Sequence, residues 1–422
     1  MKILIIGGGA REHAICWAIA KSPLKPKIYC APGNAGISQI AENVPIKVED
    51  DKALVEFAKT NQIDFVVVSP DGPLVAGLVD KMQAAGLKTF GPSAAAARLE
   101  GSKAFTKDLC RRYNIPTARY SRFTDLRKAE AFISNMIPPI VIKADGLALG
   151  KGVMIAESAA DAFAAAARLM PISGEIIVEE FLHGQELSLF AFVAGDQTLF
   201  FTTAQDHKRA FDGDHGPNTG GMGAYSPAPF VTQILQQEIM ERIINPTARA
   251  MVEMGAPFYG MLYAGLMLTD KGPYLIEYNA RLGDPECQVM LPRLKTDFLS
   301  VLQAVAGRNL NGIKLEWHSN YTLGVVYAAK GYPDAPQKGT VIRNLEKAAK
   351  KSLVFHYSTK YQGNDLIADG GRVLTIVGQA SSLEAAASQA YGAIQQIDWE
   401  GGFYRRDIGW RALGPANKSA RA

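Results

Sequence analysis

The sequence is organised around one segment, Tyr274-Leu275-Ile276-Glu277-Tyr278-Asn279-Ala280-Arg281-Leu282-Gly283-Asp284-Pro285-Glu286. If it forms a β-strand, the two-residue period places Glu277 and Asn279 on one face, with Arg281 following. Ile276 and Tyr278 then point to the opposite face and pack. A carboxylate and an amide oxygen side by side suit a Mg²⁺ that also holds substrate phosphates, and the arginine supplies a fork for a carboxylate or phosphate. A half-exposed strand whose polar face meets water is the alternative that this segment alone leaves open.

An apolar run directly upstream indicates which face is polar. Residues 261–268 have the composition of a buried strand, and Asp270-Lys271-Gly272 supplies a turn between this run and the segment above. We therefore expect a β-hairpin that holds Glu277 and Asn279 on a common face. Its first strand carries no acidic residue.

The first 100 residues alternate between apolar strands and helical patterns. Short apolar runs at residues 2–6, 28–30 and 64–68 are separated by helical patterns at residues 12–20 and 54–60. This alternation predicts a doubly wound α/β sheet that binds ligands beyond its strand ends. A dinucleotide site is disfavoured, because the third fingerprint glycine is missing and Ala31-Pro32 stands where an acidic ribose ligand is needed. Glycine amides at the helix start still suit a phosphate.

A glycine-rich loop at residues 144–152 joins two strands, 140–143 and 153–155. A P-loop instead joins a strand to a helix, and it requires Ser or Thr where this loop has Gly152. The loop is therefore predicted to be a hairpin whose backbone donors fold over phosphates. A plain glycine-rich turn is the alternative.

Two further segments supply polar groups. The segment at 176–182 runs from a strand into a linker that offers backbone groups to a purine edge, and Glu186 beyond it can accept from ribose hydroxyls. Three potential donors stand in succession at His207-Lys208-Arg209, and five glycines crowd residues 213–223. A solvated loop is the default for this composition, although glycines beside a basic cluster also allow close approach of an anion.

Composition restricts the class of protein. The 422 residues are too many for one core and predict two to four domains. A formal charge of +4, from 45 basic against 41 acidic residues, does not indicate a nucleic-acid surface, and no apolar run approaches a membrane span. The four cysteines lie far apart, without zinc spacing or a disulfide framework, and the first residues lack a signal-peptide pattern. We therefore expect a reduced, cytoplasmic protein.

The end of the chain predicts another α+β unit. Strands at 322–329 and 373–377 are followed by a helix at 383–397. The pair Arg405-Arg406 carries too little charge for nucleic acid, and we expect it to be structural.

Taken together, these features resemble the ATP-grasp superfamily and, more narrowly, the phosphoribosylamine–glycine ligase family of purine biosynthesis. The resemblance covers nearly the whole chain, to about Leu413. It rests on seven segments in order: Gly9-Ala10-Arg11-Glu12-His13-Ala14, Ala31-Pro32-Gly33-Asn34-Ala35-Gly36, Glu100-Gly101-Ser102-Lys103, Lys143-Ala144-Asp145-Gly146-Leu147-Ala148, Gln205-Asp206-His207-Lys208-Arg209, Gly216-Pro217-Asn218-Thr219-Gly220-Gly221-Met222-Gly223-Ala224, and Glu277-Tyr278-Asn279-Ala280-Arg281-Leu282-Gly283-Asp284-Pro285-Glu286.

The resemblance implies a fold of α/β and α+β parts. These are an N-terminal substrate domain with a doubly wound parallel sheet (1–101), an ATP-grasp core (102–120 and 188–322) with a small lid subdomain (121–187), and a C-terminal α+β domain (323–422). In that family ATP phosphorylates the carboxylate of glycine. The amine of 5-phosphoribosylamine then attacks the acyl phosphate, which gives glycinamide ribonucleotide, ADP and phosphate. The implied cofactors are ATP and Mg²⁺ or Mn²⁺, and the implied partners are these two small molecules, without nucleic acid or membrane. A monomer is expected, with a dimer as the alternative.

The family's residue roles carry over to matching positions. Catalytic roles are implied for Arg281, Lys143 and Asn218. Metal ligation is implied for Glu277 and Asn279. Nucleotide contacts are implied for Lys103, Lys143, Gly146, Gly150, Lys151, Gly152, Glu179, Glu180, Phe181, Leu182 and, at the ribose, Glu186. Substrate contacts are implied for Gly9, Asn34, Pro70, Asp71, Asp206, Lys208, Arg209, Thr219, Gly220, Arg281 and Asp284.

Two other functions remain open at this point. One is a ligase or formyl-transferring enzyme of the same superfamily that acts on another purine precursor, against which the N-terminal loops and Asn218-Thr219-Gly220-Gly221 count. The other is a nucleotide-binding regulator without catalysis. Residues 170–174, shorter than the family's usual loop, keep that possibility open, whereas Lys143, Glu277, Asn279 and Arg281 argue against it.

Overall fold

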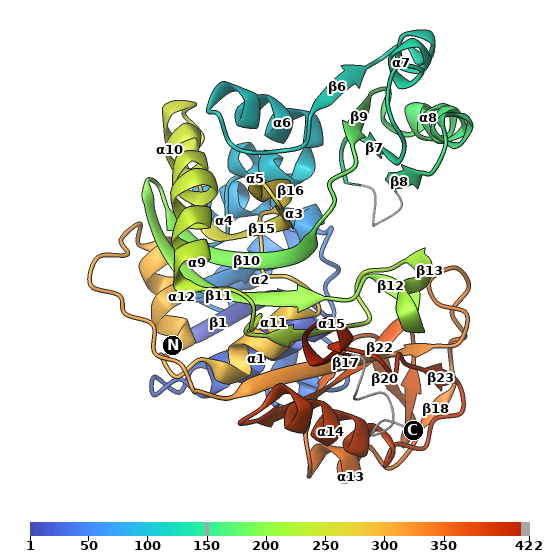
Figure 1. Ribbon diagram of the computed structural model, residues 1–422. Helices are drawn as coiled ribbons and strands as arrows, with labels where there is room; N and C mark the ends of the chain where they lie inside the picture. The colour runs from blue at the N-terminus through green and yellow to red at the C-terminus, as the bar shows by residue number, and fades with distance from the viewer. Residues whose placement is uncertain (148–151, 415–422) are drawn as a thin grey trace.

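The computed structural model describes residues 1–147 and 152–414, and Figure 1 shows their arrangement. The N-terminal part is a parallel five-stranded sheet in the order β3-β2-β1-β4-β5. Its strands are β1 (Lys2–Gly7), β2 (Lys27–Pro32), β3 (Glu42–Asn43), β4 (Phe65–Val68) and β5 (Thr89–Phe90). Its helices are α1 (Ala10–Ala20), α2 (Asp51–Thr60), α3 (Asp71–Val75), α4 (Leu78–Ala84) and α5 (Ala94–Gly101). The predicted doubly wound sheet is confirmed, and the strand order reverses at β1, where such sheets bind ligands.

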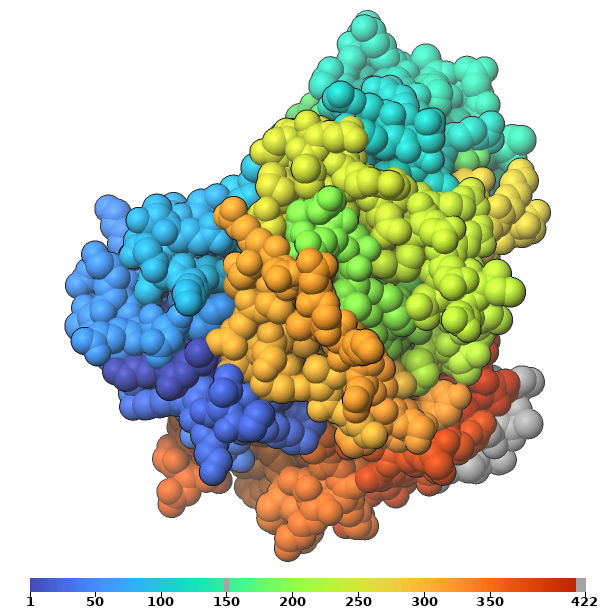
Figure 2. Space-filling model, turned by 90° about the vertical axis from the view of Figure 1, so that its left-hand side faces the viewer, coloured from blue at the N-terminus to red at the C-terminus, as the bar shows by residue number. Residues whose placement is uncertain are grey.

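A separate antiparallel sheet, the lid sheet, has the order β6-β9-β7-β8. It comprises β6 (Tyr120–Phe123), β7 (Ile140–Ala144), β8 (Val153–Ala156) and β9 (Ile176–Glu180), together with α7 (Leu126–Ile133) and α8 (Ala159–Ser173). Its apolar residues form a cluster of their own, which includes Ile133, Ile142 and Leu169. Figure 2 shows this unit projecting from the rest of the surface.

The largest sheet has nine strands in the order β16-β15-β10-β11-β14-β17-β22-β19, with β23 beside β17. The strands are β10 (Gln185–Ala194), β11 (Gln197–Asp206), β14 (Gly223–Ser226), β15 (Tyr259–Thr269), β16 (Gly272–Asn279), β17 (Tyr321–Ala329), β19 (Leu353–His356), β22 (Arg372–Ala380) and β23 (Gly402–Phe403). The sheet therefore continues from the centre of the chain into the C-terminal part, because β14 pairs with β17.

Helices and small hairpins cover this large sheet (Figure 1). The helices are α6 (Lys103–Arg112), α9 (Gln233–Ile239), a π-helical turn (Met240–Ile244), α10 (Asn245–Glu253), α11 (Glu286–Met290), α12 (Phe298–Ala306), α13 (Leu345–Ala349), α14 (Leu383–Ile394) and α15 (Trp410–Leu413). The remaining strands are β12 (Arg209–Phe211) paired with β13 (His215–Asn218), and β18 (Val341–Ile342), β21 (Asp365–Ala368) and β20 (Thr359–Gln362) in one small sheet. None of the helices in residues 1–147 and 152–414 is both long and apolar enough to span a bilayer.

The predicted hairpin of β15 and β16 is present, with one irregularity. Gly265 pairs with Glu277 while Leu266 pairs with Leu275, so Ile276 has no partner in the register. The prediction that Ile276 packs on the inner face is therefore wrong, and Ile276 lines a cavity instead. A bulge inserts one residue and reverses the alternation at that point. On β16, the buried apolar side chains include those of Leu275 and Tyr278.

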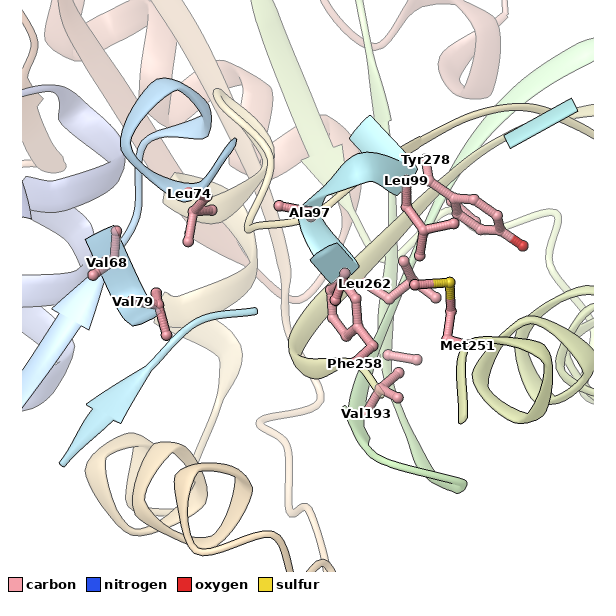
Figure 3. Close-up of a cluster of buried hydrophobic side chains, with 14 of the residues drawn as sticks. Val68, Leu74, Val79, Ala97, Leu99, Val193, Met251, Phe258, Leu262 and Tyr278 are labelled. Atoms are coloured by element: carbon pink, nitrogen blue, oxygen red, sulfur yellow. The ribbon is translucent and has the colours of Figure 1, made fainter. Parts of the chain in front are cut away.

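One apolar core joins the N-terminal sheet to the large sheet. Figure 3 shows Ala97 and Leu99 of α5 in one cluster with Val68 of β4 and Leu262 of β15. Ser93 caps α5, because its hydroxyl accepts from the amide of Ala96 at 3.3 Å. The two units are thus packed as one body, in contrast to the lid sheet with its own core.

Candidate active site

A cavity of about 480 Å³ lies where the N-terminal sheet, α6, the lid sheet and the β15–β16 hairpin meet. Each of these parts contributes wall residues, and β22 of the C-terminal part contributes Arg372. Segments far apart in the sequence therefore share one wall.

The end of β16 carries an interlocked group of side chains. Asn279 Oδ1 accepts from Arg281 Nη2 at 3.0 Å, and the same nitrogen lies 2.9 Å from Glu100 Oε1. Glu100 Oε2 accepts from the backbone amide of Ala280 at 2.8 Å. The carboxylate at the end of α5 thus orients both the strand end and the guanidinium. Arg281 Nε is buried without a hydrogen-bond partner in the described residues, so its fork has a donor to spare.

Glu277 and Asn279 offer two hard oxygen ligands to a divalent cation. Burial would raise the pKa of Glu277, but the cavity lysines, Lys208 foremost, lower it below its ordinary value, so the carboxylate is charged at neutral pH. Within residues 1–147 and 152–414, no group of three or more His, Cys, Asp or Glu side chains could hold a metal ion. Two protein oxygens fit a Mg²⁺ whose other octahedral positions are filled by phosphate oxygens and water.

Three lysines line the wall between α6 and the lid sheet. Lys143 Nζ on β7 and Lys107 Nζ on α6 each lie 3.0 Å from Glu179 Oε2. Lys103 Nζ, one helical turn before Lys107, donates to the carbonyl of Gly146 at 2.8 Å, and burial lowers the pKa of Lys103. Two of these lysines share one carboxylate and the third donates to a backbone carbonyl, so the wall keeps positive charge that suits phosphate groups.

The linker after β9 lies beside the cavity. Glu180 Oε2 accepts from Arg119 Nε at 2.7 Å, which holds this carboxylate away from the wall. Phe181 packs against His183 with ring centroids 4.9 Å apart. Glu186 pairs with Lys208 at 3.3 Å, and Lys208 is the main cause that lowers the pKa of Glu186.

The segment from β11 through β13 brings four predicted residues to the wall: Asp206, Lys208, Thr219 and Gly220. The Thr219 hydroxyl donates to the carbonyl of Lys208 at 2.8 Å and accepts from the amide of Gly221 at 3.0 Å, which closes the base of the β12–β13 hairpin.

The loops after β2 and β4 both carry predicted substrate contacts, but only the one after β4 contributes such a residue to the cavity wall. Asp71, at the start of α3, lines the cavity. Asn34 does not, because its amide nitrogen donates to the carbonyls of Gly8 (2.9 Å), His356 (2.7 Å) and Tyr357 (3.1 Å). Its side-chain oxygen accepts from two backbone amides of its own loop, at 2.9 Å each. These bonds join the N-terminal sheet to the C-terminal part, and the substrate contact expected of Asn34 stays a prediction.

The predicted residues fall into three groups. Those that line the cavity are Asp71, Lys103, Lys143, Gly146, Gly152, Glu179, Asp206, Lys208, Thr219, Gly220, Glu277, Asn279, Arg281 and Asp284. Those that lie outside its wall are Gly9, Asn34, Pro70, Glu180, Phe181, Leu182, Glu186, Arg209 and Asn218. Gly150 and Lys151 are outside the described residues.

Several residues of the cavity wall were not predicted from the sequence as site residues: Arg11, Glu100, Lys107, Tyr263, Glu286 and Arg372. Arg11 stood within a quoted motif, and its Nε donates to Glu12 Oε1 at 2.8 Å, which in turn accepts from Ser69 Oγ at 2.7 Å. Lys107 follows Lys103 by four residues, a spacing that places both on one face of a helix. That spacing was the available signal for Lys107.

Arg372 had no local signal, because it opens an ordinary strand of the C-terminal part. Its Nη1 donates to the carbonyls of Gly220 (2.6 Å) and Asp284 (2.9 Å), and its Nη2 lies 3.1 Å from Asp284 Oδ2. Tyr357 donates to Asp284 Oδ1 at 2.6 Å. Burial would lower the pKa of Arg372, but Asp284 and Tyr357 raise it, so the guanidinium stays charged.

Family models describe nearly all of the chain. The N domain of phosphoribosylglycinamide synthetase matches residues 1–100, its ATP-grasp (A) domain matches 101–287, and its C domain matches 322–411. Phosphoribosylamine–glycine ligase of Mesorhizobium japonicum is 52% identical over 419 residues, which cover 98% of this chain and 99% of that protein. The chloroplastic phosphoribosylamine–glycine ligase of Arabidopsis thaliana is 49% identical over 96% of this chain and 79% of its own length.

Solved structures agree. The crystal structure of phosphoribosylamine–glycine ligase from Thermotoga maritima has a TM-score of 0.86 and 34% identity, covering 97% of this chain and all of that one. A biotin carboxylase of Campylobacter jejuni, solved as a complex with β,γ-ATP, has a TM-score of 0.74 at 16% identity, covering 96% of this chain and 92% of that one, and so shares the fold alone.

Proposed function

Because this chain belongs to the phosphoribosylamine–glycine ligase family, and carries that ATP-dependent ligase activity in purine biosynthesis, we propose that the cavity between the lid sheet and β16 is where glycine is activated and joined to phosphoribosylamine. One observation carries the proposal. Glu277 and Asn279 share a wall with Lys103 and Lys143, so ligands for a metal face cations for phosphates. Bound Mg²⁺ would neutralise phosphate charge there.

The nucleotide end is the lysine wall. Lys103, Lys107 and Lys143 hold the phosphates of ATP, with Gly146 and Gly152 at the two ends of the glycine loop. Glu179 Oε1 is buried and has no hydrogen-bond partner in the described part of the chain. The linker at residues 180–182 supplies backbone groups to adenine, as the sequence predicts.

Both reaction steps take place beside Arg281. A carboxylate oxygen of glycine attacks the γ-phosphorus of ATP, the bond to the β-phosphate oxygen breaks, and ADP leaves. Arg281, oriented by Glu100, holds the acyl phosphate with its fork. The amine nitrogen of phosphoribosylamine then attacks the carbonyl carbon, phosphate departs, and the nitrogen loses a proton. Such transfers depend on positioning and charge stabilisation more than on covalent help from the protein.

The phosphoribosylamine end is the opposite wall. Arg11 and Arg372 are the cations there, and Asp71 stands beside the carboxyl end of β4. Two guanidiniums suit the 5′-phosphate, and the carboxylate suits ribose hydroxyls. We also propose that the protein acts as a monomer.

The test is a phosphate-release assay with purified protein, ATP and Mg²⁺. We expect release that requires both glycine and phosphoribosylamine, with glycinamide ribonucleotide identified by mass. Nucleotide binding without amine-dependent phosphate release would favour the regulator instead. Use of another purine precursor in place of phosphoribosylamine would favour the other ligase.

A further inference from the structure

The guanidinium of Arg372 has one edge left for a ligand. Its Nη1 donates to the carbonyls of Gly220 and Asp284, and its Nη2 donates to Asp284 Oδ2. A guanidinium carries five N–H donors, so the N–H of Nε and one N–H of Nη2 have no partner in the described part of the chain. These two donors form one edge of the fork, and Arg372 lines the cavity. Such an edge matches two oxygens of one phosphate group.

Tyr357 supports this guanidinium from outside the cavity. It follows β19, is 4% exposed and is not among the residues of the cavity wall. Arg372 Cζ lies 4.6 Å from the centroid of its ring, within the range of a cation–π contact. The Tyr357 hydroxyl donates to Asp284 Oδ1 at 2.6 Å, and the other oxygen of that carboxylate binds Arg372. One side chain therefore contacts the guanidinium and also orients its carboxylate partner.

The Tyr357 hydroxyl is itself held in place. Gln288 Nε2, on the fully buried part of α11, donates to this hydroxyl at 3.0 Å and to Asp284 Oδ1 at 2.6 Å. The backbone carbonyl of Tyr357 accepts from Asn34 Nδ2 at 3.1 Å. Burial foremost, with Asp284 adding to it, raises the pKa of Tyr357 well above its ordinary value against the lowering effect of Arg372. The hydroxyl therefore keeps the proton that it donates to Asp284.

This arrangement fixes Arg372 before a ligand arrives. A free arginine side chain loses much rotamer freedom when it binds a ligand, and that loss weakens binding. Here the ring of Tyr357 and the carboxylate of Asp284 hold the guanidinium within the folded protein, so its open edge is pre-organised. Tyr357 itself has no place on the wall from which to touch the ligand.

We propose that Tyr357 is a positioning residue, which holds the open edge of Arg372 toward the 5′-phosphate of phosphoribosylamine. It acts through its ring on the guanidinium and through its hydroxyl on Asp284. The C-terminal part of the chain thereby tunes the binding of one substrate without contacting the nucleotide end of the cavity. This inference rests on the proposed function, which places phosphoribosylamine at Arg372.

The experiment compares Tyr357→Phe, which keeps the ring, and Tyr357→Leu, which removes ring and hydroxyl, with the intact protein. We expect the KM for phosphoribosylamine to rise about tenfold in Tyr357→Phe and further in Tyr357→Leu, because the charged partner of Arg372 loses its hydrogen bond. The KM for ATP and for glycine should change less than about twofold. Ribose 5-phosphate, which carries the phosphate without the amine, should lose affinity as a competitive inhibitor by a similar factor. Tyr361→Phe, 54% exposed on β20, is the matched control.

A double-mutant cycle separates positioning from a general structural role. If Tyr357 acts through Arg372, adding Tyr357→Phe to Arg372→Gln should leave the KM for phosphoribosylamine within about twofold of that of Arg372→Gln alone. All kinetics are measured below the Tm of the least stable variant, taken from thermal unfolding without ligands.

Three outcomes would overturn the role of Tyr357. They are an unchanged KM for phosphoribosylamine in Tyr357→Phe, effects of the two substitutions that multiply in the double variant, and parallel rises in the KM for ATP or glycine. An Arg372→Gln variant that keeps the KM for phosphoribosylamine of the intact protein would instead count against the proposed place of that substrate.

Discussion

At the level of single residues, Glu277 has the clearest chemical signature. Its carboxylate is charged despite burial, because three lysines of the cavity lower its pKa. Glu277→Gln keeps the shape but removes the charge that Mg²⁺ favours. We expect the free Mg²⁺ concentration for half-maximal activity to rise about tenfold or more, since a charged contact is worth roughly 1.5–3 kcal/mol. The measurement is activity against free Mg²⁺ at saturating ATP.

A matched control for this substitution is Glu238→Gln, on α9 and paired with Arg242 away from the cavity. Its Mg²⁺ requirement should equal that of the intact protein. An unaltered requirement in Glu277→Gln would show that Glu277 is not a metal ligand.

Residue-level prediction from sequence succeeds where strand geometry determines the direction of a side chain. Glu277 and Asn279 line the cavity, although the bulge brings Ile276 to the same wall and Tyr278 reaches it as well. The role of Asn34 could not be predicted in this way, because an amide in a loop can bind a ligand or satisfy backbone groups. Only the folded chain shows which carbonyls lie near it. Arg372 reaches the wall through pairing of distant strands, which no local pattern encodes.

At the level of elements, the β12–β13 hairpin is held by the end of the chain. Arg405, which is fully buried, donates from Nε and Nη2 to the carboxylate of Asp407, at 2.8 Å each. Its Nη1 donates to Asp214 Oδ1 (2.9 Å) and to the carbonyl of Arg209 (3.0 Å). The expected structural role of Arg405 agrees with these contacts. Residues Lys208 and Thr219, which flank this hairpin, both line the cavity.

Arg405→Ala leaves Asp214 and Asp407 without their shared partner. We expect the free energy of unfolding to fall by about 3–5 kcal/mol, as for other broken buried ion pairs. Arg405→Lys should recover little, because a single ammonium cannot replace a fork with four bonds. Urea unfolding followed by circular dichroism measures both. Arg406→Ala, the exposed neighbour, is the control, and equal stability of the two alanine variants would contradict the anchoring role.

Strands and helices were predictable where one face meets the core. The alternation in the first 100 residues and the β15–β16 hairpin both follow the sequence pattern. The bulge at Ile276 could not be predicted from the sequence pattern, because one inserted residue leaves the hydrophobic composition unchanged. The pairing of β14 with β17, which fuses the C-terminal part to the large sheet, joins residues about a hundred positions apart and depends on packing rather than local preference.

On the scale of the whole molecule, the hydrophobic clusters indicate which parts unfold as one unit. The apolar cluster that runs from Leu4 to Ala280 spans the N-terminal and large sheets, whereas the lid sheet has a cluster of its own. The boundaries predicted for the four domains stay a prediction. The shared cluster indicates that the N-terminal sheet and the large sheet unfold together, with the lid as the independent unit.

Three buried histidines connect the C-terminal part to the rest. His356 donates its backbone amide to His13 Nδ1 at 2.9 Å, and Gly409 donates its amide to His207 Nε2 at 3.1 Å. Burial lowers the pKa of His13 to about 3, with His356 contributing, and that of His356 to about 4. Burial, with Arg411 and Arg405 adding to it, lowers the pKa of His207 to about 3.

These shifts predict how stability depends on pH. An unfolded histidine takes up a proton near pH 6.5, whereas the folded ones resist until about pH 4 or below, so the unfolded state binds more protons in between. Their contribution is complete above about pH 6.5 and is lost as the pH falls toward 4, at up to about 1.4 kcal/mol per pH unit for each histidine. His13→Asn keeps an acceptor for the His356 amide but cannot titrate. We therefore expect urea unfolding between pH 6.5 and 4.5 to show a slope smaller than that of the intact protein by up to about 1.4 kcal/mol per pH unit, the contribution of one histidine. His318→Gln, at an exposed position, should keep the full slope. If the free energy of unfolding of His13→Asn depended on pH as steeply as that of the intact protein, His13 would not contribute to the loss of stability in acid.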